Sequence, residues 1–142
     1  MKRKRLFLPT IADLIDALAI DQIKEVKLRK QKSSFSREIL KICNDIDIEL
    51  TEKKSIKLNS RLIRIVIILA QLNLHIWNLK NKMQQKPENY NKYLKLAHQL
   101  NGLRNKMKNL LLEEFEYTES SLRKTNTETD NLRGWNLSVE DN

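Results

Sequence analysis

Eight apolar residues in the middle of the chain repeat at alternating intervals of four and three residues, and no other feature constrains the fold as strongly. This spacing places them on one stripe of a helix, as in the seam of a coiled coil. Further apolar residues, among them Ile63 and Ile67, widen the apolar surface where the helix begins. Such a helix is typical of the centre of a bundle or of an oligomer. The eight residues, called the seam below, are Leu58, Leu62, Ile65, Leu69, Leu72, Ile76, Leu79 and Met83.

The chain is also poor in turn-forming residues, with two Gly and two Pro among 142 residues. A β-sandwich or an α/β fold needs many more of both. Apolar residues recur at helical spacing in residues 11–30, in residues 35–50 and again from Pro87 to Tyr117. We therefore expect an all-α protein, a four-helix bundle in which the seam helix and the last helix form a long antiparallel coiled-coil hairpin.

Several residues mark the ends of these helices. Thr10 can cap the first helix, with Asp13 returning the bond three residues later. Ser33 and Ser34 offer a cap for the second helix, whose apolar residues predict one buried face. Pro87 fits the first turn of the last helix. Gly102 lowers helix stability in that helix, which indicates a close contact with another helix.

Composition divides the chain into three parts: a basic N-terminal arm (residues 1–9), a helical domain (residues 10–117) and a polar tail (residues 118–142). The tail is rich in Ser, Thr, Asn and Glu, so we expect it to be flexible. It contains a small apolar segment around Trp135. This side chain can dock on a partner or pack back on its own subunit.

The net charge of +9 is concentrated in two stretches. Residues 61–86 contain five cations and no acidic residue, and a cluster of four cations lies near the N-terminus. A basic balance favours nucleic acid or an acidic protein as partner. The few aromatic residues are not interleaved with cations, as a single-strand binding platform requires. The candidate contacts are Lys2, Arg3, Lys4, Arg5, Arg61 and Arg64.

Polar residues on the first and last helices form a second candidate cluster. Asn101 and Arg104 or Asn105 lie one helical turn apart beside the apolar stripe, within reach of Asp13 or Asp16. Such a network can fix the register of the helices or bind a small anionic ligand. The first role is the preferred interpretation.

Motifs for catalysis or cofactor binding are missing from the sequence. Two glycines cannot supply a dinucleotide-binding or nucleotide-phosphate loop, and two histidines cannot build a histidine-rich metal site. Acidic pairs three residues apart, Asp13 with Asp16 and Glu113 with Glu116, have the spacing used by all-α nucleotide pyrophosphohydrolases that hold Mg²⁺. Their places at helix ends favour ordinary surface roles, so no catalytic residue, metal or cofactor is expected.

The sequence also predicts the compartment. Its one cysteine, Cys43, lies in an apolar stripe and is expected to be a small buried side chain. Between the basic cluster and Pro9 there are only three apolar residues, too few for a secretory signal. The run from Ile65 to Ala70 is shorter than the roughly 20 residues of a membrane span. We expect no membrane span and a cytoplasmic protein, or one associated with a virion if a phage encodes it.

Two segments resemble a group of small helical bacterial and phage proteins without an established activity. The resemblance rests on residues 10–24, which begin Thr-Ile-Ala-Asp-Leu-Ile-Asp, and on Asn101-Gly-Leu-Arg-Asn105. Members often have Lys-x-Trp-His after the first segment, whereas this chain has Lys24-Glu-Val-Lys27 there. Bacterial members are often encoded beside glycosyltransferases of surface-polysaccharide synthesis. The resemblance implies a helical fold and assigns no reaction.

These observations favour a non-enzymatic assembly or interaction protein, a homo-oligomer that self-associates through the seam helix. The seam from Leu62 to Met83 would form the core of the bundle or of the oligomer. A basic nucleic-acid-associated protein is the alternative, and a metal-dependent all-α nucleotide phosphohydrolase is a more remote one.

Overall fold

The structure, a computed structural model, describes residues 8–130 and 132–140, and these residues form helices and connecting loops only. The four long helices are α1 (Ile11–Lys27), α2 (Lys32–Glu52), α3 (Ser60–Gln85) and α4 (Tyr90–Glu114). Short 3₁₀ turns are η1 (Arg29–Gln31), η2 (Pro87–Asn89), η3 (Ser120–Leu122) and η4 (Ser138–Glu140). The prediction of an all-α fold is confirmed.

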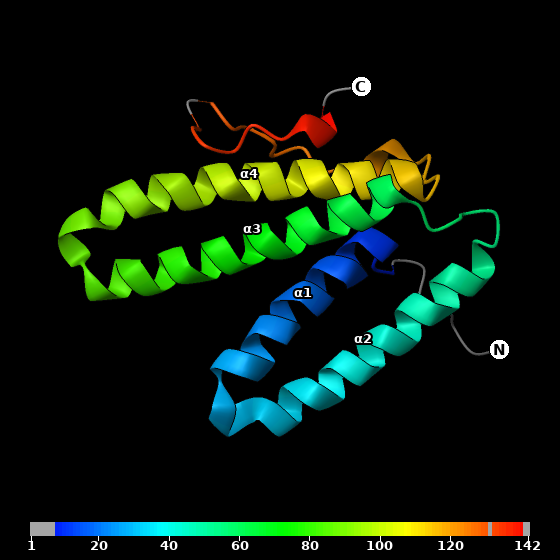
Figure 1. Cartoon of the computed structure of the whole chain (residues 1–142), viewed down its shortest axis with the longest axis horizontal. Helices are drawn as coiled ribbons and strands as arrows, with labels where there is room; N and C mark the ends of the chain where they lie inside the picture. Colours follow the sequence, from blue (N-terminus) through cyan, green and yellow to red (C-terminus); the bar gives the residue numbers. More distant parts are fainter. Residues whose placement is uncertain (1–7, 131, 141–142) are drawn as a thin grey trace.

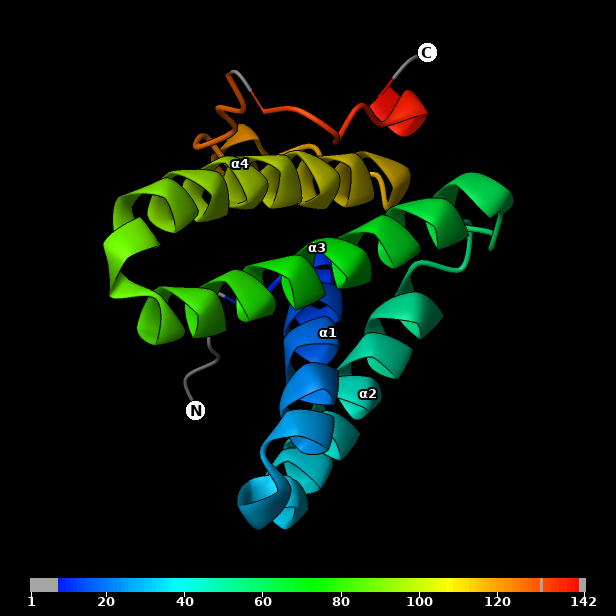
Figure 2. The same cartoon turned by 60° about the vertical axis from the view of Figure 1, so that its left-hand side comes forward.

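The helices form two hairpins. In the first, α1 packs against α2, and in the second α3 packs along α4. Figure 1 shows α3 and α4 side by side, with α1 between them and α2. Helix α1 crosses both α3 and α4, whereas α2 packs against α1 and η1. The turned view in Figure 2 shows the α1–α2 hairpin projecting steeply from the α3–α4 hairpin.

The seam forms the centre of the core. Its residues from Leu62 to Leu79 are buried within the chain, Met83 is half-buried, and Leu58 precedes the helix and is 76% exposed. The same core contains apolar residues of α1, α4 and the chain after α4. The fully buried members on α4 are Leu100, Leu103, Met107, Leu111 and Leu112.

The predicted helix ends are right in one place and wrong in others. The Thr10–Asp13 capping box is present, so that prediction is confirmed. The first helix ends at Lys27 rather than Lys30, and α2 begins at Lys32 without a side-chain cap, so Ser33 and Ser34 lie inside it. Every residue of α2 is half-buried or exposed, Cys43 included, because α1 is the one long helix packed against it.

The chain after α4 turns back and runs along that helix (Figure 1, orange to red). We call residues 117–130 and 132–140 the C-terminal arm. Leu122, Trp135 and Leu137 pack half-buried against the core, and Val139 is buried. The composition predicted a flexible polar tail with a small apolar segment around Trp135. In the described residues of the arm this segment packs back on its own subunit, and its apolar side chains recur at alternate positions from Trp135 to Val139.

Candidate functional site

A network of charged side chains joins α1, α3 and α4 where the two hairpins cross. Asp16 of α1 is buried, and its carboxylate accepts hydrogen bonds from Arg104 Nη2 at 2.7 Å and from Arg104 Nε at 3.0 Å. Asn73 of α3 donates to the same carboxylate at 2.8 Å. Burial by itself raises the pKa of Asp16, but the hydrogen bonds and the charge of Arg104 outweigh it and hold that pKa below its usual value.

A second carboxylate, that of Asp13, lies beside the first. Lys108 Nζ contacts it at 2.8 Å and Lys124 Nζ contacts it at 3.1 Å. Lys108 also reaches Asp16 at 3.5 Å, so it bridges the two carboxylates. Burial opposes ionisation of Asp13, but the two lysines outweigh it and lower its pKa to about 2. Both carboxylates are therefore ionised at neutral pH and paired with cations.

The structure brings together four of the five residues of the expected polar network. Asp13, Asp16 and Arg104 make the contacts described above, and Asn101 accepts a hydrogen bond from Arg104 at 3.1 Å. Asn105 lies apart from them and donates to the backbone carbonyl of Asn126.

Sequence reasoning missed three members of the network: Asn73, Lys108 and Lys124. The sequence contains evidence from which two of them could have been predicted. Asn73 is a polar residue inside the most apolar helix, and Lys108 follows Arg104 by four residues and so shares its helix face. Lys124 lies in the C-terminal arm, where no local periodicity indicates its partner.

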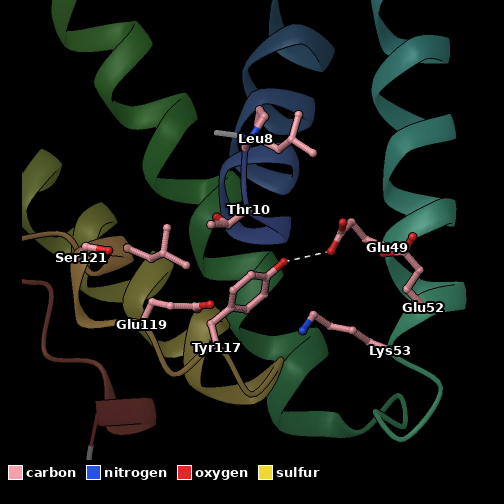
Figure 3. Close-up of a pocket in the computed structure, with 10 residues that line it drawn as sticks. Leu8, Thr10, Glu49, Glu52, Lys53, Tyr117, Glu119 and Ser121 are labelled. Atoms are coloured by element: carbon pink, nitrogen blue, oxygen red, sulfur yellow. Dashed lines mark hydrogen bonds between the residues drawn. The ribbon is translucent and has the colours of Figure 1, made fainter. Parts of the chain in front are cut away.

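A polar hollow of about 430 Å³ lies beside the network, between the beginning of α1 and the ends of α2 and α4. Figure 3 shows the ring of Tyr117 in this hollow, with Glu49 opposite its hydroxyl group. The hydroxyl donates to Glu49 at 3.0 Å and accepts from the backbone N–H of Ile11 at 3.2 Å. The Nζ atom of Lys53 lies 4.2 Å from the ring centroid.

Burial and the neighbouring Glu49 raise the pKa of Tyr117 to about 12, although the bond from Ile11 acts in the opposite direction. The phenol is therefore neutral at physiological pH. In this state its hydrogen bonds join α1 and α2 to the chain that follows α4, which is a structural role.

A row of side chains on α4 holds the backbone of the C-terminal arm. Asn109 donates to the carbonyl of Lys124 at 3.0 Å and accepts from its N–H at 2.7 Å. Asn105 donates to the carbonyl of Asn126 at 2.8 Å, and Gln99 donates to that of Asp130. A Cβ atom on Gly102 would collide with the carbonyl of Glu128. Gly102 thus permits close approach of the arm, not of another helix as the sequence suggested.

Some of the remaining predicted site residues lie among the residues that the structure describes, and the others lie outside them. Trp135 contacts its own subunit, with its ring edge-to-face against His75 at a centroid distance of 5.0 Å. Arg61 pairs with Glu114 at 2.9 Å and donates to the carbonyl of Val139, and Arg64 donates to Ser138. The two arginines are thus engaged with α4 and the arm. The cluster Lys2, Arg3, Lys4 and Arg5 lies outside the described residues.

The acidic pairs are arranged differently from a metal site. Asp13 and Asp16 are bound by cations, and Glu113 pairs with Arg123. Within residues 8–130 and 132–140, no group of three or more His, Cys, Asp or Glu side chains is placed to hold a metal ion.

The outer face of α3 is apolar and exposed. Ile63 is 45% exposed, Ile67 60% and Leu74 41%, and their spacing of four and seven residues places them on one stripe. We call these three residues the outer stripe. Beside it, a groove of about 260 Å³ runs between α2 and α3 with α1 as its floor. Its lining is wholly apolar and includes Ile15, Leu50 and Val66 besides Ile63 and Ile67.

Among the described helices, α3 is also the one long and apolar enough to cross a membrane by length and composition. Nearly half of its most apolar window is buried against the rest of the protein. A core helix of a soluble protein has the same properties.

Comparisons with protein families, with curated proteins and with solved structures find no match to this chain. The resemblance to the small helical bacterial and phage proteins therefore stays a prediction.

Proposed function

We propose that this chain is a non-enzymatic assembly protein that self-associates through α3. One observation carries the proposal. Helix α3 packs against α4, α1 and the C-terminal arm, yet its remaining side presents the outer stripe to solvent. Apolar patches that continue into an apolar groove mark interaction surfaces more often than scattered single residues do.

The proposed surface differs from the one that the heptad pattern indicated. The seam residues from Leu62 to Leu79 are already buried within one chain, so they cannot also meet a second copy. The outer stripe is a separate surface, rotated around α3 from the seam. Gln71 and Asn78 beside the stripe are uncharged, and Arg64 at its edge is engaged with Ser138 of the arm, so the stripe itself carries no charge that would repel a second copy.

A second copy of the chain carries the same apolar stripe, so its surface matches this one in hydropathy. In a two-fold dimer each copy contributes the same patch, so an apolar stripe meets an apolar stripe. The groove beside the outer stripe would receive side chains from the partner, which extends the buried area beyond a single helix contact.

The test compares two substitutions of exposed apolar residues by the same charged residue. Ile67→Glu places a charge in the outer stripe, and Leu40→Glu places one on α2, where Leu40 is 70% exposed and does not line the groove. We expect Ile67→Glu to reduce the molar mass to that of a monomer in light scattering across a concentration series. Leu40→Glu should keep the wild-type mass.

Equal masses for the two variants would contradict the proposal. A monomeric wild-type protein that binds vesicles of neutral lipid through Ile67 would also contradict it, since the apolar face would then serve a membrane. Circular dichroism of both variants controls for folding, because neither residue is buried.

A further inference from the structure

Helix α4 ends in a motif in which glycine is the usual residue. The N–H of Tyr117 donates to the carbonyl of Leu112 at 2.9 Å, and that of Glu116 donates to the carbonyl of Glu113 at 3.0 Å. This pair of bonds is a Schellman motif, in which the residue corresponding to Glu116 adopts a left-handed conformation. The φ angle of Glu116 is indeed +60°. Glu has a Cβ atom, so it is disfavoured there relative to Gly.

The sequence around this turn would also permit a straight helix. Residues 103–133 contain neither Gly nor Pro, so no residue near Glu116 forces the chain to leave the helix. The turn is therefore maintained by the contacts of the C-terminal arm with the rest of the molecule. If Glu116 became helical, its strain would be relieved and the arm would be carried away from its own α4.

The contacts that hold the arm are of a kind that a second copy offers equally well. Asn105, Asn109 and Gln99 bond to backbone atoms of the arm. The ion pair of Lys124 with Asp13 holds the arm as well, and after exchange all of these contacts are remade on the other copy, so none is lost in the final state. Its apolar anchors, Trp135 and Val139, fit the same positions on any copy of the chain.

We propose that Glu116 is a strained hinge through which two copies of this chain exchange their C-terminal arms, each arm docking on α4 of the other copy. Reciprocal exchange of an identical element closes a symmetric dimer at little cost in contacts, and strain in the hinge favours it. The exchanged arm docks on α4 and on the side of α3 that carries Arg61 and His75, whereas the proposed self-association uses the outer stripe of α3. The two proposals therefore stand independently.

The experiment detects an arm docked on another molecule. All proteins are full-length and carry Cys43→Ser, so that the only thiols are those introduced. One population carries His98→Cys on α4 and the other carries Asn126→Cys on the arm, two exposed positions that line the same hollow. The two populations are incubated together and treated with a short bis-maleimide. A covalent product between copies is expected when arms exchange.

Three controls show how much of the product cross-linked between copies comes from arm exchange. A single chain that carries both cysteines should cross-link within itself. Its cross-linking yield is the reference for an arm docked on its own α4. A mixture of His98→Cys with Leu40→Cys, whose second thiol lies on α2, gives the yield from random collisions. The whole set is repeated with Ile67→Glu, which separates arm exchange from association through α3.

The hinge is tested by Glu116→Gly, which relieves the strain without opening the turn. It should lower the yield between copies about fivefold, the ratio that corresponds to roughly 1 kcal/mol at the left-handed position. Glu119→Gly makes the same change at a residue with an ordinary φ of −70° and should leave the yield unchanged. A yield between copies no higher than random collision would overturn the proposal, as would equal yields for the two glycine variants.

Discussion

Arg104 and Asp16 lie 88 residues apart in the sequence, yet the guanidinium group of Arg104 contacts both carboxylate oxygens of Asp16, at 2.7 and 3.0 Å. This pair joins α4 to α1 and so joins the two hairpins. Asn73 adds α3 to the same carboxylate. A buried carboxylate with these partners favours this crossing of the hairpins, because a crossing that separates Asp16 from Arg104 would leave a buried charge with weaker partners.

Arg104→Ala should destabilise the protein by about 3 kcal/mol, since it leaves the Asp16 charge buried with weaker partners. Arg123→Ala is the matched control, because Arg123 and Glu113 form a pair in which both side chains are about half exposed. Its cost should be within about 1 kcal/mol. Urea denaturation measures both. Similar losses for the two variants would show that the Asp16 pair does not hold the hairpins together.

Acid should destabilise the fold through Asp13. The pKa of this group is about 2 in the folded state and about 4 in an unfolded chain. Its contribution to stability is therefore complete above pH 4 and is lost as the pH falls from about 4 to about 2. The contribution amounts to at most about 2 kcal/mol, since solvent screens part of the interaction. Asp13→Asn should flatten this part of the pH profile, and an unchanged slope would refute the assignment.

Asp21 should change the stability of the fold with pH in the direction opposite to Asp13. It is buried, its Oδ2 atom has no hydrogen-bond partner among the described residues, and burial together with the neighbouring Glu38 raises its pKa. A raised pKa in the folded state stabilises the protein at low pH, and this stability is lost as the pH rises through that pKa. Asp21→Asn should therefore be more stable than wild type at pH 7. Exposed Asp45→Asn should not, and thermal melts at several pH values compare the two.

Gly102→Ala should release the C-terminal arm from α4. Ala favours a helix over Gly by about 1 kcal/mol, but its Cβ atom would collide with the carbonyl of Glu128. Hydrogen exchange should become faster in residues 122–130, with α4 itself still protected. The control Asn91→Ala lies in the first turn of α4, whereas Gly102 lies at its midpoint. An unchanged exchange rate in the arm would mean that its backbone does not lie against Gly102.

Leu69→Ala should be among the most damaging single substitutions. Leu69 is fully buried in the middle of the seam, so its truncation should cost about 2–5 kcal/mol. Lys80→Ala, at an exposed position of the same helix, should change stability by at most about 0.5 kcal/mol. Ala favours a helix at both sites, which controls for helix propensity. Equal stabilities would show that the seam is not a buried surface.

The sequence by itself determined which segments are helical and which stripe of α3 is buried. Both follow from local properties, because apolar spacing, the Thr10 capping box and the shortage of Gly and Pro act within a few turns of the chain. Part of the charged network could also be predicted, since Asn101 and Arg104 share a helix face beside the apolar stripe.

The tertiary structure alone decided what lies against each helix face. Apolar periodicity shows that a face is buried but not by which neighbour, so it did not reveal that α2 packs against α1 and stays half-exposed. Nor did it reveal that the polar chain after α4 returns along that helix. The arm is held by amide side chains bonded to backbone atoms, and backbone atoms are the same in every sequence. The pairing of Lys124 with Asp13 likewise depends on two segments that meet only when the chain is folded.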